Sequence, residues 1–413
     1  MAAVYRKIMW RLVPFLMLLY TVAFLDRVNI GFAALTMNRD LGITDSVYGF
    51  AAGVFFLIYC LFQVPANLVL ARVGARRWLG FLPVLWGAVT MATALVASSG
   101  AYIAARAVLG FAEAGFYSGV IFYFTIWLPR SLRTRVLALF LLSLPLCNVV
   151  GSPVSAYILH MDRVLGLHGW QWIFLLEGAP AVLLGIAAWF LLADNPQSAA
   201  WLSAEEKERV ARDLAADDAF HHAGAARVWL KVAGDSVAYF LWSTGIYGLS
   251  FWLPKILVAR GASPDSTGWW AGLTFAAGAV ALLWASRQRH VRMLPLLFLA
   301  AGAGFACCGM AQTLAVAVAG FCLAAMGLLS SLPMFWSVAA SRLSGKGGGA
   351  AIAIVNSWGA VGAFAGPYAM GWLHDATHKY AAGLWAIAAC LVCGAIMTAG
   401  EARRPSRHAL ATR

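Results

Sequence analysis

Charge is what this sequence has least of. Only 11% of its 413 residues are Asp, Glu, Lys or Arg, while 62% are hydrophobic. Soluble globular proteins carry about 25% charged residues, so this composition excludes an ordinary soluble domain. Apolar stretches of about 20 residues, the length that crosses a bilayer as one helix, recur along the whole chain. The 18 Trp often lie near the ends of these stretches, as in the aromatic belts of membrane proteins.

The chain also lacks the residue clusters that enzymes and disulfide frameworks need. All 7 Cys lie inside apolar stretches, so no disulfide or zinc framework is expected. The 8 His are scattered in the connecting segments, which argues against a membrane enzyme with a metal or nucleophile site. The basic, apolar N-terminus has no small-residue cleavage site after it, so we expect an uncleaved first helix.

The apolar stretches predict an all-α membrane protein with twelve transmembrane helices. Between the sixth and the seventh lies the longest polar stretch, 193–228, where the capping-box pattern from Ser203 to Glu206 predicts a short surface helix. We therefore expect a six-helix half at 1–192, a linker at 193–228 and a second six-helix half at 229–413. The predicted helices lie approximately at 12–34, 46–70, 78–98, 101–127, 134–159, 170–192, 229–254, 267–286, 293–310, 314–340, 349–373 and 380–399.

The net charge of +13 is distributed unevenly between the two sides of these helices. Of the 30 Lys and Arg, 23 fall on the side that holds both termini and 5 on the other side. By the positive-inside rule, both termini and the linker are predicted to be cytoplasmic. The same distribution explains the basic composition as membrane topology, so no nucleic-acid partner is expected.

The first predicted helix contains an adjacent acid and base, Asp26 and Arg27. Each charge near a bilayer centre costs about 2.5–3.5 kcal/mol even on the lenient insertion scale. Neighbouring residues of a helix point about 100° apart, so the two side chains cannot simply neutralise each other. Each needs a partner on another helix or in a water-filled cavity. One interpretation is a buried structural ion pair; we favour a site that handles charge across the membrane.

The fourth predicted helix carries a second acid–base set, Arg106 and Glu113. The two are seven residues apart, about two helical turns, and so share one helix face. Gly110 and Gly115 would allow another helix to approach closely. Two such sets in one half are too costly to be accidental, and we expect both to face the same aqueous cavity.

These residues suit the cotransport of an organic anion with protons. Arg27 and Arg106 would attract a carboxylate, because the guanidinium is always charged and its fork matches that group. Asp26 and Glu113 would carry protons, since carboxyls in a cavity of low dielectric constant can be protonated near neutral pH. Such a site needs no cofactor, and the proton is the coupling ion. The alternative is that Glu113 is only a structural partner of Arg106.

Other polar residues are expected in supporting roles. Tyr59 and Gln63 lie one turn apart in the second helix, where they either line the pore or form helix–helix hydrogen bonds. Glu177 is expected to make a structural contact near the membrane interface. The second half has no ionisable residue near a predicted helix centre. It is therefore expected to contribute neutral hydrogen bonds and stacking, with Trp336 and Asn356 among its polar residues.

Several motifs carry a family likeness, among them Phe24-Leu25-Asp26-Arg27-Val28-Asn29-Ile30-Gly31-Phe32-Ala33, Gly110-Phe111-Ala112-Glu113-Ala114-Gly115-Phe116 and Trp170-Gln171-Trp172-Ile173-Phe174-Leu175-Leu176-Glu177-Gly178. They resemble the major facilitator superfamily and, within it, the anion:cation symporter family of bacterial organic-acid carriers. The resemblance extends nearly from end to end. It implies the twelve-helix major facilitator fold in a bacterial inner membrane, and we expect a monomer.

The resemblance also implies inward cotransport of a carboxylate with protons by alternating access. Asp26 and Glu113 match the proton-binding positions of the family, and Arg27 and Arg106 match positions that face the substrate. The neutral site positions are matched by Tyr59, Trp336 and Asn356. The likeness is strongest to carriers of tartrate and similar hydroxy or aromatic acids.

The fifth predicted helix bears on the alternatives. Its Pro145 and Pro153 predict a kink. The position where sugar-acid carriers place Gln falls near Ser143 and Leu144, which favours a smaller or more aromatic acid over a sugar acid. A drug or sugar exporter of the same fold is the main rival, and the absence of the antiporter Gly-Pro pattern argues against it. A membrane receptor that resembles a transporter is the other alternative.

Overall fold

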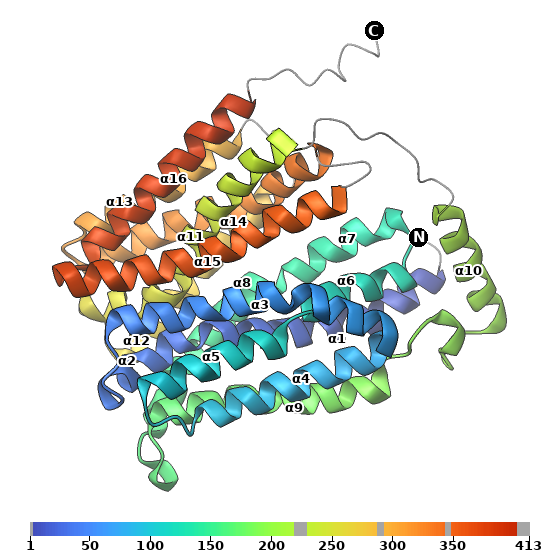
Figure 1. Ribbon diagram of the computed structural model, residues 1–413, viewed down its shortest axis with the longest axis horizontal. Coiled ribbons are helices and arrows are strands. Elements are labelled where there is room, and N and C mark those ends of the chain that lie inside the picture. Colours follow the sequence, from blue (N-terminus) through green and yellow to red (C-terminus); the bar gives the residue numbers. More distant parts are fainter. Residues whose placement is uncertain (1–2, 219–228, 287–292, 343–347, 403–413) are drawn as a thin grey trace. The chain divides into compact units, whose positions relative to one another are not determined.

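A computed structural model of the protein describes residues 3–218, 229–286, 293–342 and 348–402 (Figure 1). Within these ranges the regular elements are all helices. The end of the predicted linker, 219–228, lies outside the described residues, as does the C-terminus. The placement of those segments stays a prediction.

The chain divides into two compact units. Unit 1 comprises Met1–Ile43 and Val54–His222, and unit 2 comprises Thr44–Gly53 and Ala223–Arg413. The first nine residues of α3 (Asp45–Val73) therefore belong to unit 2 and the rest of that helix to unit 1.

Unit 1 consists of helices and three short 3₁₀ turns. Its other α-helices are α1 (Ala3–Val28), α2 (Ile30–Asp40), α4 (Ala75–Thr93), α5 (Ser99–Glu113), α6 (Phe116–Trp127), α7 (Arg130–Leu141), α8 (Ser143–Ile158), α9 (Gly169–Leu191) and α10 (Ala204–Asp218). The 3₁₀ turns are η1 (Leu159–Met161), η2 (Val164–Gly166) and η3 (Pro196–Ser198).

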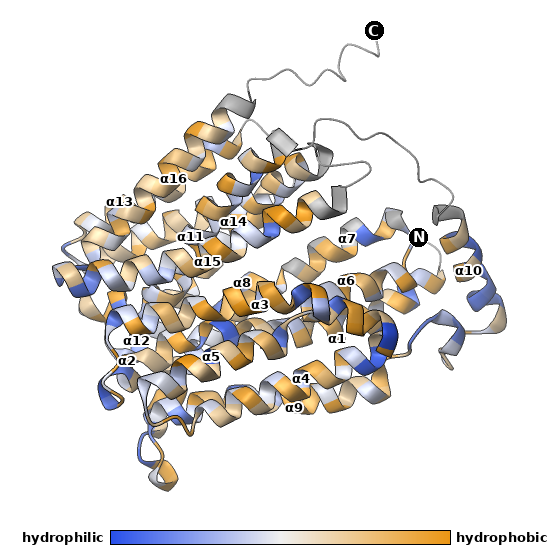
Figure 2. Cartoon of the chain, viewed as in Figure 1, coloured by the Kyte–Doolittle hydropathy of each residue, from blue (hydrophilic) through white to orange (hydrophobic). Residues whose placement is uncertain are grey.

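Unit 2 adds six long helices to the start of α3. They are α11 (Trp229–Ala259), α12 (Pro264–Ala285), α13 (Leu294–Met310), α14 (Leu314–Arg342), α15 (Gly348–Thr377) and α16 (Tyr380–Ala402). Their residues are mostly apolar, as the hydropathy colouring of the cartoon in Figure 2 shows.

Helices occupy all twelve positions at which the sequence predicted spans. Among the described residues, seven helical segments are long and apolar enough to cross a membrane by length and composition alone. A shorter apolar helix is α13. All-helical architecture is thus confirmed, whereas the number of crossings stays a prediction.

Three of the predicted spans are interrupted. The first is divided at Asn29, and the fourth at Gly115, whose φ of 87° is left-handed and suits glycine. The fifth is divided at Leu142, between α7 and α8. This boundary lies N-terminal to both Pro145 and Pro153, and the kink that we predicted from them stays a prediction. Pro145 lies in the first turn of α8, where a missing N–H costs little.

Glycines bring helix backbones of each unit into contact. In unit 1 a Cβ at Gly87 would lie 2.7 Å from the carbonyl oxygen of Gly178, so α4 and α9 touch along their length. A Cβ at Gly110 would lie 2.4 Å from the carbonyl oxygen of Phe55, which confirms the predicted close approach at this glycine. The contact holds α5 against α3 and so positions the charged residues of α5.

The polar helix α10 is bound to the start of α1. Its capping box forms as predicted, since the Glu206 amide donates to Ser203 Oγ and the Ser203 amide donates to a Glu206 carboxylate oxygen. Lys7 Nζ pairs with Glu206 at 2.9 Å, and the Tyr5 hydroxyl donates to Asp213 at 2.8 Å. The bond from the Lys7 ammonium holds the pKa of Glu206 below its usual range. The surface helix expected in this linker is confirmed; in Figure 2 it is largely hydrophilic.

Candidate functional site

Four charged side chains lie in the interior of unit 1. Asp26 and Arg27 come from α1, and Arg106 and Glu113 come from α5. Their exposed fractions are 1%, 6%, 1% and 0%, respectively. Charges are almost never buried this completely unless they are paired or functional.

Arg27 and Glu113 form the ion pair of this site. Arg27 Nε donates to Glu113 Oε2 at 2.6 Å, and the side chains are 7% and 0% exposed. The guanidinium also lies over two rings of α3, 5.0 Å from the centroid of Tyr59 and 5.5 Å from that of Phe55. Cation–π contacts of this kind stabilise a cation that water does not reach.

This pairing corrects one expectation from the sequence. Arg106 and Glu113 share a face of α5, but residues two turns apart are separated by about 10 Å along the helix axis. Glu113 therefore pairs with α1 rather than with Arg106. Arg106 Nη1 donates instead to the backbone carbonyl of Asp26 at 3.5 Å, and its guanidinium lies 5.0 Å from the centroid of the Phe55 ring.

The Asp26 carboxyl has a different environment from its neighbour Arg27. Both carboxyl oxygens are buried, and within the described part of the chain neither makes a hydrogen bond or an ion pair. The Thr90 hydroxyl of α4 lies beside it, and Arg106, Glu113 and Glu177 interact with it electrostatically. The divergence of about 100° between adjacent helical residues thus separates the acid from the base, as the sequence predicted.

Glu177 of α9 lies in the interior of unit 1, and its side chain is only 2% exposed. The Ser155 hydroxyl of α8 donates to Glu177 Oε1 at 2.6 Å. The expected position of this residue near the membrane interface stays a prediction. The polar residue Asn29, one turn after Asp26, was the signal that could have revealed this second polar region.

The neutral candidates lie in both units. Tyr59 contacts Arg27, as described above, and Gln63 follows one turn later in α3, half-buried. In unit 2, Trp336 is half-buried in α14 and packs edge-on against Tyr239, with ring centroids 5.0 Å apart. Asn356 is half-buried in α15. Whether these residues bind a ligand stays a prediction.

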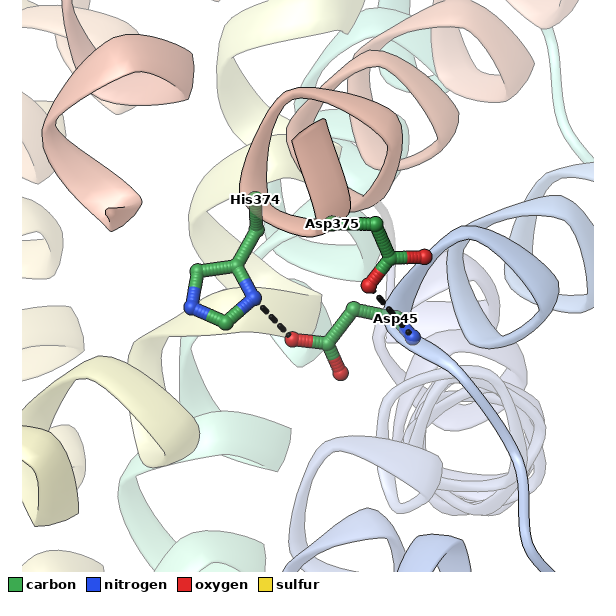
Figure 3. Close-up of side chains that lie close together, drawn as sticks. All are labelled: Asp45, His374 and Asp375. Carbon is green, nitrogen blue, oxygen red and sulfur yellow. Dashed lines mark hydrogen bonds and ion pairs between the residues drawn. The ribbon is translucent and has the colours of Figure 1, made fainter. Parts of the chain in front are cut away.

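A second group of charges lies at one end of unit 2 (Figure 3). His374 Nδ1 and Asp45 Oδ2 are 2.6 Å apart, and Lys255 Nζ pairs with the other oxygen of Asp45. Asp375 accepts hydrogen bonds from the backbone amides of Asp45 and Ser46, at 3.2 and 2.8 Å, and from the Ser46 hydroxyl. His374, Asp45 and Asp375 are close enough to bind one metal ion together. Since the Lys255 ammonium already neutralises Asp45, we interpret the group as an ion-pair network.

Comparisons with known proteins agree with this architecture. The family model described as Major Facilitator Superfamily matches residues 16–367. The chain is 42% identical over 409 residues to a putative tartrate transporter of Agrobacterium vitis, covering 96% of this chain and 94% of that protein. It is 36% identical over 412 residues to a quinolone resistance transporter of Acinetobacter baumannii, with coverage of 96% and 94%.

Solved structures show the same fold. The xylose transporter XylE of Escherichia coli, in a partially occluded inward-open conformation, matches with a TM-score of 0.78. The match covers 97% of this chain and 98% of that one. Sequence identity is 13%, so this likeness concerns the fold alone.

Proposed function

Because the chain belongs to the major facilitator superfamily, and is a multi-pass membrane transporter and not an enzyme, we propose that it imports an organic carboxylate together with protons by alternating access. The carboxylate is a hydroxy acid such as tartrate, or an aromatic or sugar acid. Arg27 and Arg106 bind the anion, and Asp26 and Glu113 bind the protons. Tyr59, Gln63, Trp336 and Asn356 supply neutral contacts.

The buried pair of Arg27 and Glu113 is the observation that carries this proposal. While Glu113 is ionised, its carboxylate occupies the guanidinium that an incoming anion needs. Protonation of Glu113 neutralises this competitor and releases Arg27 for the substrate carboxylate. The anion and the proton therefore favour each other's binding, and such reciprocal coupling is what symport requires.

Glu113→Gln tests this coupling, because glutamine resembles the protonated acid but cannot release a proton. The variant should bind substrate and exchange it across the membrane of proteoliposomes, yet fail to accumulate it under an imposed pH gradient. Glu208→Gln, which changes an exposed acid of α10, is the matched control and should accumulate normally. If Glu113→Gln lowers only the melting temperature and still accumulates substrate, Glu113 is a structural residue.

The substrate and the topology need separate measurements. A panel of hydroxy, aromatic and sugar acids can be ranked by thermal shift, since a bound ligand stabilises the folded protein by RT ln(1 + [L]/Kd). Both termini and the linker are proposed to be cytoplasmic, in a bacterial inner membrane. A reporter fused after Ala215 in α10 should report the cytoplasm, and a periplasmic signal would contradict the twelve-helix topology.

Drug export is the second candidate, and the quinolone resistance transporter among the relatives favours it. The two candidates differ in direction. An importer accumulates substrate in vesicles that are acidic outside, whereas a proton-coupled exporter loads vesicles that are acidic inside. Transport assayed with both gradient directions in one preparation decides between them.

A further inference from the structure

Glu177 is a buried acid that the proposed coupling step does not use. It lies in α9, and only 2% of the residue is exposed, far less than for an acid on a solvated surface. Its Oε1 accepts the hydrogen bond from Ser155, while its Oε2 is buried and makes no hydrogen bond within the described residues. Within those residues no Lys or Arg side chain lies within ion-pair distance of it. A permanently ionised carboxylate is costly in such surroundings, so this group holds a proton for at least part of the time.

The arrangement of α1 directs a second acid towards Glu177. Asp26 and Asn29 are three residues apart and share a helix face, which differs from the face that carries Arg27. The Glu177 carboxyl interacts electrostatically with Asp26 and lies beside the Asn29 amide. Asn29 is 1% exposed, and its amide makes no hydrogen bond of normal geometry in the described part of unit 1. This amide is therefore available to bridge the two acids.

Side chains of α8, α4 and α5 also lie around the two acids. From α8 come the Ser155 hydroxyl and the Cys147 thiol, and from α4 comes the Thr90 hydroxyl. Arg106 and Glu113 of α5 act on Asp26. Two neighbouring carboxyls that lack a direct cation cannot both ionise easily, and their protons belong to the pair.

We infer that Glu177 is a further proton-binding residue of this transporter and that it loads and unloads one of the transported protons through Asp26. In the loading step a proton moves from an Asp26 Oδ to a Glu177 Oε, so that Glu177 becomes neutral and Asp26 becomes a carboxylate. Asp26 then binds a second proton from the aqueous side. Unloading is the reverse. The Ser155 hydroxyl and the Asn29 amide are the donors that stabilise Glu177 while it is ionised.

This inference rests on the proposed function, and the experiment separates the two. Purified Glu177→Gln and wild-type protein are compared in proteoliposomes, with the membrane potential set to zero and an inward proton gradient of about one pH unit. Each proton coupled to substrate contributes about a tenfold factor to the equilibrium accumulation ratio under that gradient. The ratio should therefore be about tenfold lower in the variant. It depends on stoichiometry and not on the rate or the amount of folded protein, so a structural role alone would not change it.

A milder pair of variants covers the case in which Glu177→Gln does not fold. Ser155→Ala removes the donor to Glu177, and Ser152→Ala removes another buried hydroxyl of α8 as the control. Without its donor, ionised Glu177 is less stable, so the pH dependence of substrate exchange should move to higher pH in Ser155→Ala only.

The outcomes are distinct. An unchanged accumulation ratio in Glu177→Gln overturns this inference while leaving symport intact. If that variant does not fold, identical pH profiles of Ser155→Ala and Ser152→Ala overturn it. Wild-type protein that accumulates nothing under the proton gradient overturns the proposed function itself.

Discussion

The two units differ in how they satisfy polar groups in their interiors. Buried hydroxyls of unit 2 bond mainly to carbonyls of their own helix, one turn back. Examples are Ser250 to Ile246, Thr274 to Trp270 and Thr398 to Gly394. In unit 1 the buried polar groups reach other helices, as Arg27 does with Glu113 and Ser155 does with Glu177. The helices of unit 1 are therefore joined in their core by bonds between side chains, some of them charged. In the described part of unit 2, buried bonds between helices run from neutral donors to backbone carbonyls, as from Trp242 to Leu328 and from Trp252 to Pro367.

This difference teaches where charge can be coupled to movement. A hydroxyl that bonds within its own helix keeps its partner when that helix shifts as a whole. Its hydrogen bond therefore does not depend on the positions of neighbouring helices. A bond between two helices changes when either helix moves or when one partner gains a proton. Among the described residues of unit 2, the ion pairs of Asp45 with Lys255 and His374 lie at one end of the helices. We therefore expect charged substrate and protons to act first on unit 1.

Removing one partner of the central ion pair should have the largest effect. Arg27→Ala leaves Glu113 as a buried charge without its direct partner, which typically costs about 3–5 kcal/mol of folding free energy. The double variant Arg27→Ala/Glu113→Gln removes that charge and should recover most of the loss, but not transport. Thermal unfolding in detergent measures both.

Thr274→Val is the matched change in unit 2. It deletes a buried hydroxyl that donates to the Trp270 carbonyl one turn back in α12, so we expect a loss of about 0.5–1.5 kcal/mol. Equal losses in Arg27→Ala and Thr274→Val would remove the distinction between the two units.

Arg106→Lys should have the next largest effect, on binding rather than on folding. A lysine keeps the charge but not the planar fork that can bind both oxygens of a carboxylate. We expect the substrate to lose about 2–5 kcal/mol of binding free energy, measured by calorimetry. Arg76→Lys changes an arginine that bonds to the Trp189 carbonyl and should leave affinity unchanged. If Arg106→Lys binds as tightly as the wild type, direct recognition by a forked arginine is wrong.

The smallest effect is expected at the end of unit 2. Burial raises the pKa of Asp375, but hydrogen bonds from the Ser46 hydroxyl and from the Ser46 and Asp45 amides outweigh it, so the pKa lies below its usual range. A lowered folded-state pKa stabilises the protein above the unfolded-state value, and this stabilisation is lost as the pH falls through the folded-state value. Asp375→Asn should therefore cost about 1 kcal/mol at neutral pH, as for other lost helix caps. Unfolding measured at neutral and acidic pH should show the difference between variant and wild type disappear in acid.

Helical periodicity predicts the directions of side chains in unit 1, but it does not predict which helix or side chain lies opposite them. The divergence of Asp26 and Arg27 follows from the angle between adjacent helical residues, and the structure places them in different environments. The close approach of another helix at Gly110 followed from glycine alone, although the sequence did not say that this helix is α3. The partner of Glu113 did not, because a shared face says nothing about which neighbouring helix lies opposite. The hydrogen bond between Glu177 and Ser155 did not follow either, because periodicity within α9 says nothing about which side chain of α8 lies opposite.

The order in which the chain is synthesised gives the α1–α10 contact a further meaning. The partner of Tyr5, Asp213, is made 208 residues later. At about 5–20 residues per second, synthesis of the residues between Tyr5 and Asp213 takes at least about ten seconds. The bond between the first helix and α10 cannot form before then. The hydrogen bonds from the Asp45 and Ser46 amides to Asp375 form later still, because their partners are separated by 330 and 329 residues. The contact between α1 and α10 can thus form before most of unit 2 exists, while the start of α3 is capped only after α15 has been made.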